Sequence, residues 1–186
     1  MSLRIIAGNL GGRRIEALPG TATRPTRAAV REAWFSALGD RVHGSRVLDL
    51  FSGSGALGIE ALSRGASSAT FIESDRRSCR VLERNLSRLG IEARASVRCA
   101  DALAYVESLV RARRREWDIV LADPPYGGAA AARLVEAFGA FAFAAVLCVE
   151  HAPGVVFTRP ADWRRRYGAS ALSFYLDPKE GASGHA

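Results

Sequence analysis

Short apolar runs alternate with amphipathic segments along most of the chain after residue 46. The runs are rich in β-branched and other apolar residues, and their length suits strands buried on both faces of a parallel sheet. A further apolar stretch, residues 170–176, is predicted as one more strand in an edge hairpin. The predicted buried strands are residues 47–51, 69–73, 93–98 and 145–150, together with 116–126, which ends in a turn.

Apolar residues at helical spacing lie between these strands. One stripe follows Glu73 and stops before Gly90, a residue type typical of helix C-termini, and a second runs from Leu103 to Val110. Residues 129–141 are rich in alanine and are also predicted to be helical. The alternation predicts an α/β fold with a mostly parallel sheet, helices on both faces and an antiparallel hairpin at one edge.

The first 45 residues follow a different pattern. LRIIAG and RRIEAL flank NLGG, which predicts a small β-hairpin with glycines in its turn. Pro25 and Thr26 are good helix-start residues, so a helix is expected from there. We therefore expect an extension (1–45), a main domain (46–178) and a frayed tail (179–186).

One stripe of the predicted N-terminal helix mixes charged and apolar residues. Arg27 and Arg31 fall on the side that carries Trp34 and Leu38, although a solvated face is the easier place for a charge. The pair indicates either the edge of a ligand site or long side chains that snorkel at the rim of a core, and the two readings are equally supported.

Composition limits the classes of protein. Apolar residues make up 48% of the 186, so a sizeable core is expected and disorder is not. No apolar run reaches the ~20 residues of a membrane helix, and no secretory signal is recognisable, so a cytoplasmic protein is expected. The cysteines and histidines are scattered, which predicts neither a metal site nor a disulfide framework.

The net charge is +7, and Lys179 is the only lysine, so nearly all of the positive charge is arginine. A GC-rich coding sequence could by itself account for the high arginine content. Positive charge nevertheless attracts phosphate backbones, so nucleic acid becomes a somewhat better candidate partner.

A glycine-rich loop, DLFSGSGALG at 49–58, follows the first predicted strand. Gly53 and Gly55 belong to a G-x-G-x-x-G pattern, and Glu73 follows Gly53 by twenty residues at the end of the next strand. Such a loop lets a ligand approach a helix N-terminus, and the acid can bind both hydroxyls of a ribose. The glycine-rich loop and the acid at this distance suit NAD and S-adenosylmethionine equally well.

Asp49 separates the two cofactors. A carboxylate beside the loop would repel a pyrophosphate but would attract the sulfonium and ammonium groups of S-adenosylmethionine. Asp49 could instead only brace the loop. Asp101, just past the third strand, could accept from an adenine amino group, and it is also a good helix N-cap.

The motif DPPY, at 123–126, follows the fourth buried strand. Two prolines fix the turn and leave rigid carbonyl acceptors. The Asp123 carboxylate, the Pro124 carbonyl and the Tyr126 ring suit a planar aromatic amine, which donates two hydrogen bonds while its base stacks on the tyrosine. This arrangement favours methyl transfer to an exocyclic amine, driven mainly by positioning and electrostatics.

DLFSGSG, IESD, CADAL and ADPPY resemble the successive motifs of class I S-adenosylmethionine-dependent methyltransferases that act on exocyclic amines. TRPTRAAVREAWFSAL and RIIAGNLGGRRI are similar to a narrower group, the bacterial family that methylates a guanine N2 in 16S ribosomal RNA. The resemblance covers nearly the whole chain. It implies a Rossmann-like methyltransferase domain behind a small extension that helps to hold RNA, with 16S rRNA of the small subunit as partner.

The resemblance also implies functional residues. Independently of the resemblance, no metal and no membrane partner are expected, and the protein is expected to be a monomer. Catalytic roles fall on Asp123, Pro124 and Tyr126. Cofactor binding falls on Asp49, Ser52, Gly53, Gly55, Glu73, Ser74, Asp101 and Ala102. RNA binding falls on Asn9, Arg13, Arg24, Thr26, Arg27 and Arg31. Arg27 and Ala28 stand where many members carry polar residues, so the individual RNA contacts are less well defined than the class.

Three other functions stay open at this point. An adenine-N6 or other amine methyltransferase would share every catalytic residue, although the short chain shows no obvious DNA target-recognition domain. An NAD-dependent oxidoreductase would leave DPPY unexplained. A non-catalytic RNA-binding protein on the same scaffold is disfavoured by the intact Asp123 and Tyr126.

Overall fold

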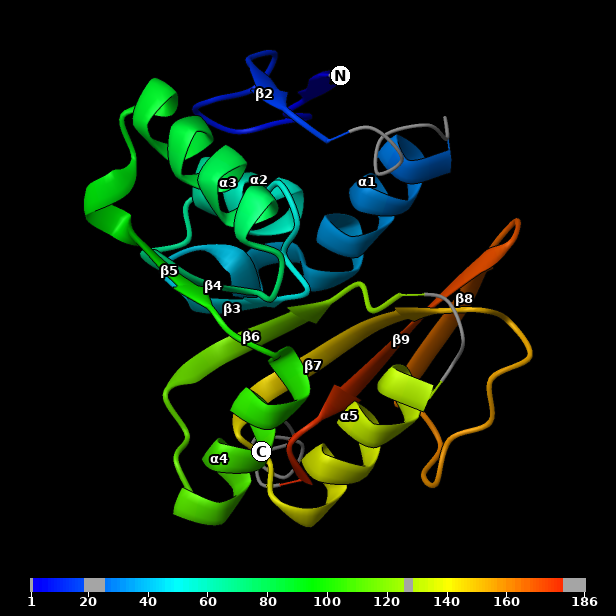
Figure 1. Ribbon diagram of the computed structural model, residues 1–186. Helices are drawn as coiled ribbons and strands as arrows, with labels where there is room; N and C mark the ends of the chain where they lie inside the picture. The colour runs from blue at the N-terminus through cyan, green and yellow to red at the C-terminus, as the bar shows by residue number, and fades with distance from the viewer. Residues whose placement is uncertain (1, 19–25, 126–128, 179–186) are drawn as a thin grey trace.

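The computed structural model describes residues 2–18, 26–125 and 129–178. Within them, the main sheet has seven strands in the order β5-β4-β3-β6-β7-β9-β8 (Figure 1). The strands from β5 to β7 run parallel, and β9 pairs antiparallel with both β7 and β8. The strands are β3 (Arg46–Leu50), β4 (Ser68–Glu73), β5 (Ala95–Cys99), β6 (Trp117–Ala122), β7 (Ala144–His151), β8 (Trp163–Tyr167) and β9 (Ser170–Leu176).

The predicted α/β class, the mostly parallel sheet and the hairpin at its edge are confirmed. The strand order reverses between β3 and β6, because the chain runs from β3 outward to β5 and then crosses back to β6. Loops that leave the two central strands at such a reversal diverge and open a crevice, which is where ligands bind in sheets of this kind. The fold therefore places a cleft between the ends of β3 and β6.

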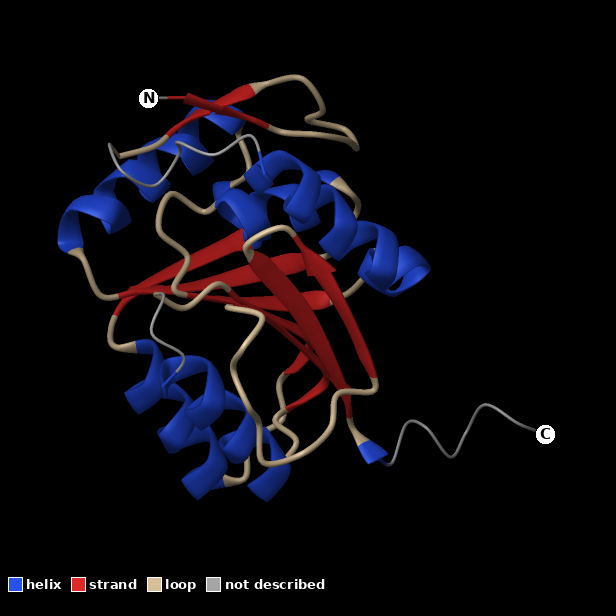
Figure 2. Ribbon diagram, turned by 90° about the vertical axis from the view of Figure 1, so that its right-hand side faces the viewer, coloured by secondary structure: helices blue, strands red, loops and turns tan. Residues whose placement is uncertain are grey.

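Helices cover both faces of the sheet, as Figures 1 and 2 show. Two apolar clusters result, one on each face, and together they enclose the strands. One face carries α1 (Thr26–Leu38), α2 (Ala56–Ser63) and α3 (Arg76–Leu89), and the other carries α4 (Ala102–Ala112) and α5 (Ala129–Ala140). Short 3-10 turns cover Gly39–Val42 and Glu92–Arg94, and the second of them delays the start of β5 relative to the predicted 93–98.

Helix α3 shows why its sequence folds as it does. The Asp75 side chain accepts hydrogen bonds from the backbone N–H groups of Arg77, at 3.1 Å, and Ser78, at 3.3 Å, so it caps the first turn. Gly90 ends the helix at φ 68°, in the left-handed region that favours glycine. The predicted end of this helix is confirmed.

The N-terminal extension packs into the main domain. Strands β1 (Ser2–Arg4) and β2 (Arg14–Glu16) form the predicted antiparallel hairpin, which lies beside α3 (Figure 1). Ile5 and Ile15 join Trp34 in the same apolar cluster as the sheet. The domain boundary at residue 45 stays a prediction, and residues 179–186, predicted as a tail, lie outside the described residues.

Two buried polar side chains hold the hairpin in place. Glu60, on α2, accepts hydrogen bonds from the backbone N–H groups of Ile6, at 2.8 Å, and Ala7, at 3.0 Å. Asn85, on α3, accepts from the Glu16 N–H at 2.8 Å and donates to the Glu16 carbonyl at 2.9 Å. The Asn85 amide also donates to the Ser54 carbonyl at 3.0 Å, so it joins the hairpin to the glycine-rich loop.

Candidate active site at the strand ends

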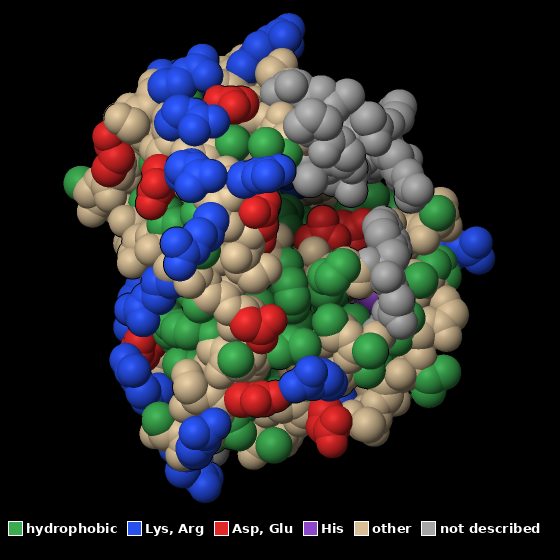
Figure 3. Space-filling view, viewed as in Figure 1, with side chains coloured by type: hydrophobic (Ala, Val, Ile, Leu, Met, Phe, Trp, Pro, Cys, Tyr) green, Lys and Arg blue, Asp and Glu red, His purple; other side chains and the backbone are tan. Residues whose placement is uncertain are grey.

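A cleft of about 380 Å³ lies at the carboxyl ends of β3, β4 and β6. In Figure 3 acidic side chains lie in a hollow near the centre of the molecule, whereas Arg side chains run along one edge. The cleft brings together most of the predicted catalytic and cofactor-binding residues. Its lining includes Asp49, Ser52, Gly53, Glu73 and Ser74 on one side and Asp123 and Pro124 on the other.

Asp49 is the most deeply buried acid of the cleft, with 1% of its surface exposed. Its Oδ2 accepts a hydrogen bond from the Gly58 N–H at 2.8 Å, and its Oδ1 has no hydrogen-bond partner among the described residues. Burial raises the pKa of Asp49 to about 8; the Gly58 hydrogen bond opposes this rise, and the charges of Asp123 and Glu73 add to it. A positively charged ligand group would supply what this carboxylate lacks.

Glu73 is bound to the glycine-rich loop rather than standing apart from it. Its Oε2 accepts from the Gly53 N–H at 2.8 Å, and its Oε1 accepts from the Asp75 N–H at 2.8 Å. Each carboxylate oxygen keeps a second lone pair, so both can still accept from a ribose hydroxyl. Gly53 has φ 53°, and a Cβ built on it would meet nothing within 4 Å, which leaves the space above the loop open to a ligand.

Sequence reasoning missed several residues that line the cleft. Phe51 directly follows β3 and adopts φ 57°, a strained value for a residue other than glycine. The sequence analysis counted Phe51 as the last residue of the predicted strand 47–51, whereas β3 ends at Leu50. Leu3 reaches the cleft from the N-terminal hairpin, and no local pattern predicts this contact. The other unpredicted lining residues are Ser54, Ala56, Leu57, Ser78 and Pro125.

The predicted amine-binding turn lies across the cleft from the glycine-rich loop. Strand β6 ends at Ala122, so Asp123 and Pro124 stand directly at its tip. Asp123 is partly buried and Pro124 is buried. Tyr126, the third predicted catalytic residue, lies outside the described residues.

Three predicted cofactor residues do not line the cleft. Asp101 is exposed and caps α4, where its Oδ1 accepts from the Ala104 N–H at 2.8 Å. Ala102 is buried in the apolar cluster on the α4 side of the sheet. Gly55 adopts φ 84° before α2, and a Cβ there would lie 2.3 Å from Leu82 Cδ1. The structure gives all three a structural role, and their cofactor contacts stay predictions.

The predicted RNA-binding residues occupy different environments. Asn9 is exposed, and its backbone N–H donates to the Ser63 carbonyl at 2.8 Å. The Arg13 guanidinium donates to the Arg88 carbonyl at 2.8 Å and so caps the end of α3. Arg31 is buried, with 7% exposed. Thr26 and Arg27 lie in α1, but their side chains and the whole of Arg24 lie outside the description.

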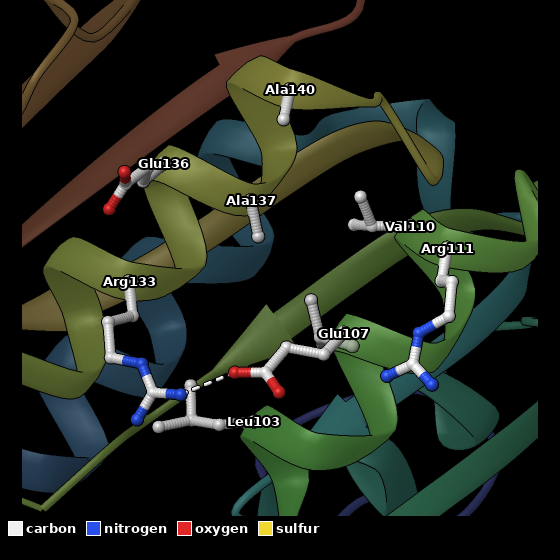
Figure 4. A pocket seen from close by; sticks show the side chains of 9 residues that line it. Leu103, Glu107, Val110, Arg111, Arg133, Glu136, Ala137 and Ala140 are labelled. Carbon is white, nitrogen blue, oxygen red and sulfur yellow. Dashed lines mark hydrogen bonds and ion pairs between the residues drawn. The ribbon is translucent and has the colours of Figure 1, made fainter.

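Another hollow, of about 410 Å³, lies on the opposite side of the sheet. Figure 4 shows it between α4 and α5, where Arg133 pairs with Glu107. Its lining comes from helix surfaces alone and contains none of the acidic strand ends, so we place the site in the other cleft.

Within the described residues, no group of three or more His, Cys, Asp or Glu could hold a metal ion. Also among them, no helix is long and apolar enough to cross a membrane. The three cysteines are free, and Cys99 is the exposed one.

The strand order and the acidic cleft at its reversal define a class I methyltransferase fold. The Escherichia coli protein yhhF superimposes with a TM-score of 0.80 at 30% identity, over 95% of this chain and 98% of that one. The Thermus thermophilus 16S rRNA N2 G1207 methyltransferase (RsmC) shares the fold, with a TM-score of 0.69 at 21% identity over 95% of this chain and 50% of that one.

The family model described as "Conserved hypothetical protein 95" matches residues 3–176, and the chain belongs to this family. Ribosomal RNA small subunit methyltransferase D of Escherichia coli K12 is 38% identical over 124 residues, 67% of this chain and 60% of that protein. The Bacillus subtilis protein YlbH is 40% identical over 126 residues, 67% of each chain. The chain thus spans about three fifths to two thirds of these relatives. The expected kinship with 16S rRNA methyltransferases is confirmed.

Proposed function

We propose that the protein transfers a methyl group from S-adenosylmethionine to the exocyclic N2 amine of a guanine in 16S rRNA of the small ribosomal subunit. One observation carries the proposal: Asp123 and Pro124, at the tip of β6, line the same cleft as Asp49 and Glu73 on the other side of the strand-order reversal. The names of the relatives, small-subunit rRNA methyltransferases, support the class of substrate.

The residues of the cleft fit this cofactor. The unpartnered Oδ1 of buried Asp49 suits a cationic group, and Glu73 suits a ribose. The open space above Gly53 lets a ligand approach the backbone. S-adenosylmethionine would supply an electrophilic methyl group on a sulfonium. A pyrophosphate cofactor such as NAD would instead bring negative charge next to Glu73 and Asp123, and would gain nothing from ionisation of Asp49.

Catalysis rests on the turn after β6. The amine of the base donates one hydrogen bond to the Asp123 carboxylate and one to the Pro124 carbonyl, which localises its lone pair for attack on the methyl carbon. With the methyl donor bound, the N–C bond would form as the S–C bond breaks, and the electron pair of the broken bond would stay on sulfur. The amine becomes acidic only as it gains the methyl, so Asp123 or solvent can take the proton, and Tyr126 stacks against the base.

RNA would be held by the N-terminal extension, through Asn9, Arg13, Arg24, Thr26, Arg27 and Arg31 or their neighbours. The positive net charge of the chain supports contact with phosphates. A guanine in a folded RNA must be unpaired or extruded before its amine can reach Asp123. A monomeric, cytoplasmic enzyme acting on the small subunit or an assembly intermediate completes the proposal.

Mass spectrometry of nucleosides tests the assignment. Unmethylated 16S rRNA, small subunits and DNA are each incubated with the protein and labelled cofactor, digested and analysed. We expect N2-methylguanosine from rRNA, and mapping of the labelled fragment gives the target. Label on N6-methyladenine in DNA or RNA would overturn the proposal in favour of the adenine alternative. Binding of NAD without binding of S-adenosylmethionine would favour an oxidoreductase.

A further inference from the structure

A narrow recess of about 60 Å³ opens beside the cleft. It shares Leu3, Ala56, Leu57 and Asp123 with the cleft, so the two spaces meet at the predicted amine-binding carboxylate. The rest of its lining comes from two other elements. Helix α1 contributes Arg31 and Trp34, and the end of β7 contributes Glu150.

Two residues that line the recess, Arg31 and Trp34, each carry a buried donor that has no partner in the described part of the chain. Arg31 is 7% exposed and Trp34 is 0% exposed. Arg31 Nε and Trp34 Nε1 have no hydrogen-bond partner among the described residues, although Arg31 Nη2 donates to the Arg4 carbonyl at 2.7 Å. A buried unpaired donor costs about 1–3 kcal/mol, so two of them on residues that line one recess point to an absent acceptor.

The size of the recess limits what can supply that acceptor. The recess measures about 60 Å³ against about 380 Å³ for the cleft, so it suits the edge of a ring rather than a whole nucleobase. The remainder of the base would lie in the adjoining cleft, where Asp123 stands. The recess therefore suits the edge of a base whose amine is bound at Asp123.

Resting on the proposed function, we infer that this recess reads the target base as guanine. Arg31 and Trp34 donate to the O6 keto oxygen, Glu150 accepts from N1–H, and Asp123 accepts from the N2 amine. Along its Watson–Crick edge, guanine carries one acceptor (O6) followed by two donors (N1–H and the N2 amine). The residues that line the recess carry the complementary groups, which are donors for O6 and carboxylates for the two N–H groups. Arg31, Trp34 and Glu150 are then specificity-determining residues.

The same residues disfavour adenine and cytosine, the other bases with an exocyclic amine. Adenine bound by its N6 amine at Asp123 places the N1 acceptor, a lone pair, against Glu150, and its C2–H opposite Arg31. Cytosine bound by its N4 amine likewise places N3, an acceptor, against Glu150. A site built to hydrogen-bond a substrate group rejects an analogue that lacks it far more strongly than an apolar pocket can.

A base analogue separates recognition of the edge from recognition of the amine. The 16S rRNA segment around the mapped target is prepared with guanine or with 2-aminopurine at that position. 2-Aminopurine keeps the amine, lacks O6 and carries an acceptor at N1. We expect the wild-type protein to transfer to guanine at least a hundredfold faster than to 2-aminopurine.

Two variants test the residues. Glu150→Gln and Trp34→Phe are expected to lower transfer to guanine at least tenfold while changing transfer to 2-aminopurine by no more than about threefold, so the preference collapses. Glu150→Gln is expected to help 2-aminopurine if anything, because the Gln amide can donate to N1. Glu136→Gln, an exposed carboxylate on α5, is the matched control.

Thermal unfolding and cofactor titration establish that each variant is folded. Arg31→Lys replaces either variant that is not. Equal preference for guanine in the wild type and all folded variants would show that the recess only packs or holds water, and the inference would be wrong. Failure of the proposed function looks different, because the wild-type protein would then methylate no guanine at all.

Discussion

The backbone N–H of Gly58, in the first turn of α2, donates to Asp49 Oδ2 at 2.8 Å. Gly55, the N-cap residue of this helix, has no side chain to cap it. Asp49 therefore performs from β3 the capping that the helix lacks, and the same carboxylate lines the cleft. One residue links the stability of the domain to its proposed cofactor site, and its charge state affects both.

Stability should depend on pH through Asp49. Its pKa is raised to about 8 in the folded protein, above the ordinary value near 4, so the folded state holds the proton more tightly than the unfolded state. The free energy of unfolding should therefore fall as pH rises from about 4 to about 8, by up to about 1.4 kcal/mol per pH unit from this group.

Urea unfolding of the wild type and Asp49→Asn at several pH values across this window measures that contribution. Asparagine does not titrate, so the difference between the two proteins isolates Asp49 from other groups. Parallel pH dependences in the two proteins would show that Asp49 is ionised when folded.

Cofactor binding should release a proton from Asp49. A bound cation favours the carboxylate, so binding below pH 8 must first remove the proton that burial retains. Affinity for S-adenosylmethionine should rise with pH, by up to about tenfold per unit, and level off above pH 8. Calorimetry in two buffers of different ionisation enthalpy counts the protons, and proton release that is unchanged in Asp49→Asn would contradict the role.

Asp123→Asn should abolish transfer without loss of cofactor binding. The partner of Asp123 in the proposed reaction is the amine of the base, and loss of the charge removes the main electrostatic contact. We expect transfer to fall at least a hundredfold, in the range typical of a single transition-state hydrogen bond. Asp40→Asn, an exposed acid near the end of α1, is the control. Undiminished turnover in Asp123→Asn would contradict the proposed role of Asp123 in methyl transfer.

Two glycine substitutions should separate folding from binding. A Cβ on Gly58 would lie 2.3 Å from Phe71 Cε1 and 3.0 Å from Asp49 Oδ2, so Gly58→Ala should destabilise the fold by about 1–3 kcal/mol. A Cβ on Gly53 meets nothing within 4 Å, so its φ of 53° is the main cost, about 1–2 kcal/mol.

The methyl group of Gly53→Ala would stand in the cleft that Gly53 lines. We therefore expect a larger loss of cofactor affinity than of stability in this variant, as measured by titration and by urea unfolding. The opposite ranking would place the ligand elsewhere.

Asn85→Ala should weaken both the fold and the glycine-rich loop. Asn85 is 1% exposed, and its amide makes three hydrogen bonds, to the N–H and carbonyl of Glu16 and to the carbonyl of Ser54. Loss of these bonds should lower the free energy of unfolding by about 2–4 kcal/mol, since buried backbone groups lose their partners. Ser87→Ala, exposed on the same helix, should have little effect. Equal stability of the two variants would contradict this account.

Site residues at the ends of the strands could be predicted from the sequence. Contacts between segments that are distant in the chain could not. Asp49, Glu73 and Asp123 could be placed because each stands at or near the end of a buried apolar run, and parallel strands bring their carboxyl ends together. Asp101 fitted the same rule and was also predicted as a helix N-cap; the structure confirms the cap, and Asp101 lies outside the lining of the cleft.

Arg31 and Arg13 show where local pattern is insufficient. Helical spacing revealed that Arg31 shares a face with Trp34, but which surface covers that face depends on β1 and β7, which are distant in sequence. The family resemblance assigned Arg13 to RNA binding, and this stays a prediction; its bonds to the carbonyls at the end of α3 arise only from the packing of the hairpin on that helix. Contacts between remote segments leave no periodic trace in a single sequence.

The attachment of the N-terminal hairpin limits where the chain can be truncated. The buried side chains of Glu60 and Asn85 accept hydrogen bonds from the backbone N–H groups of residues 6, 7 and 16. A trimmed chain that starts at residue 46 would leave a buried carboxylate and a buried amide without those partners, and would bare the apolar surface that Ile5 and Ile15 cover. The N-terminal extension is thus a structural part of the main domain, and a chain that lacks it should aggregate instead of folding as a smaller domain.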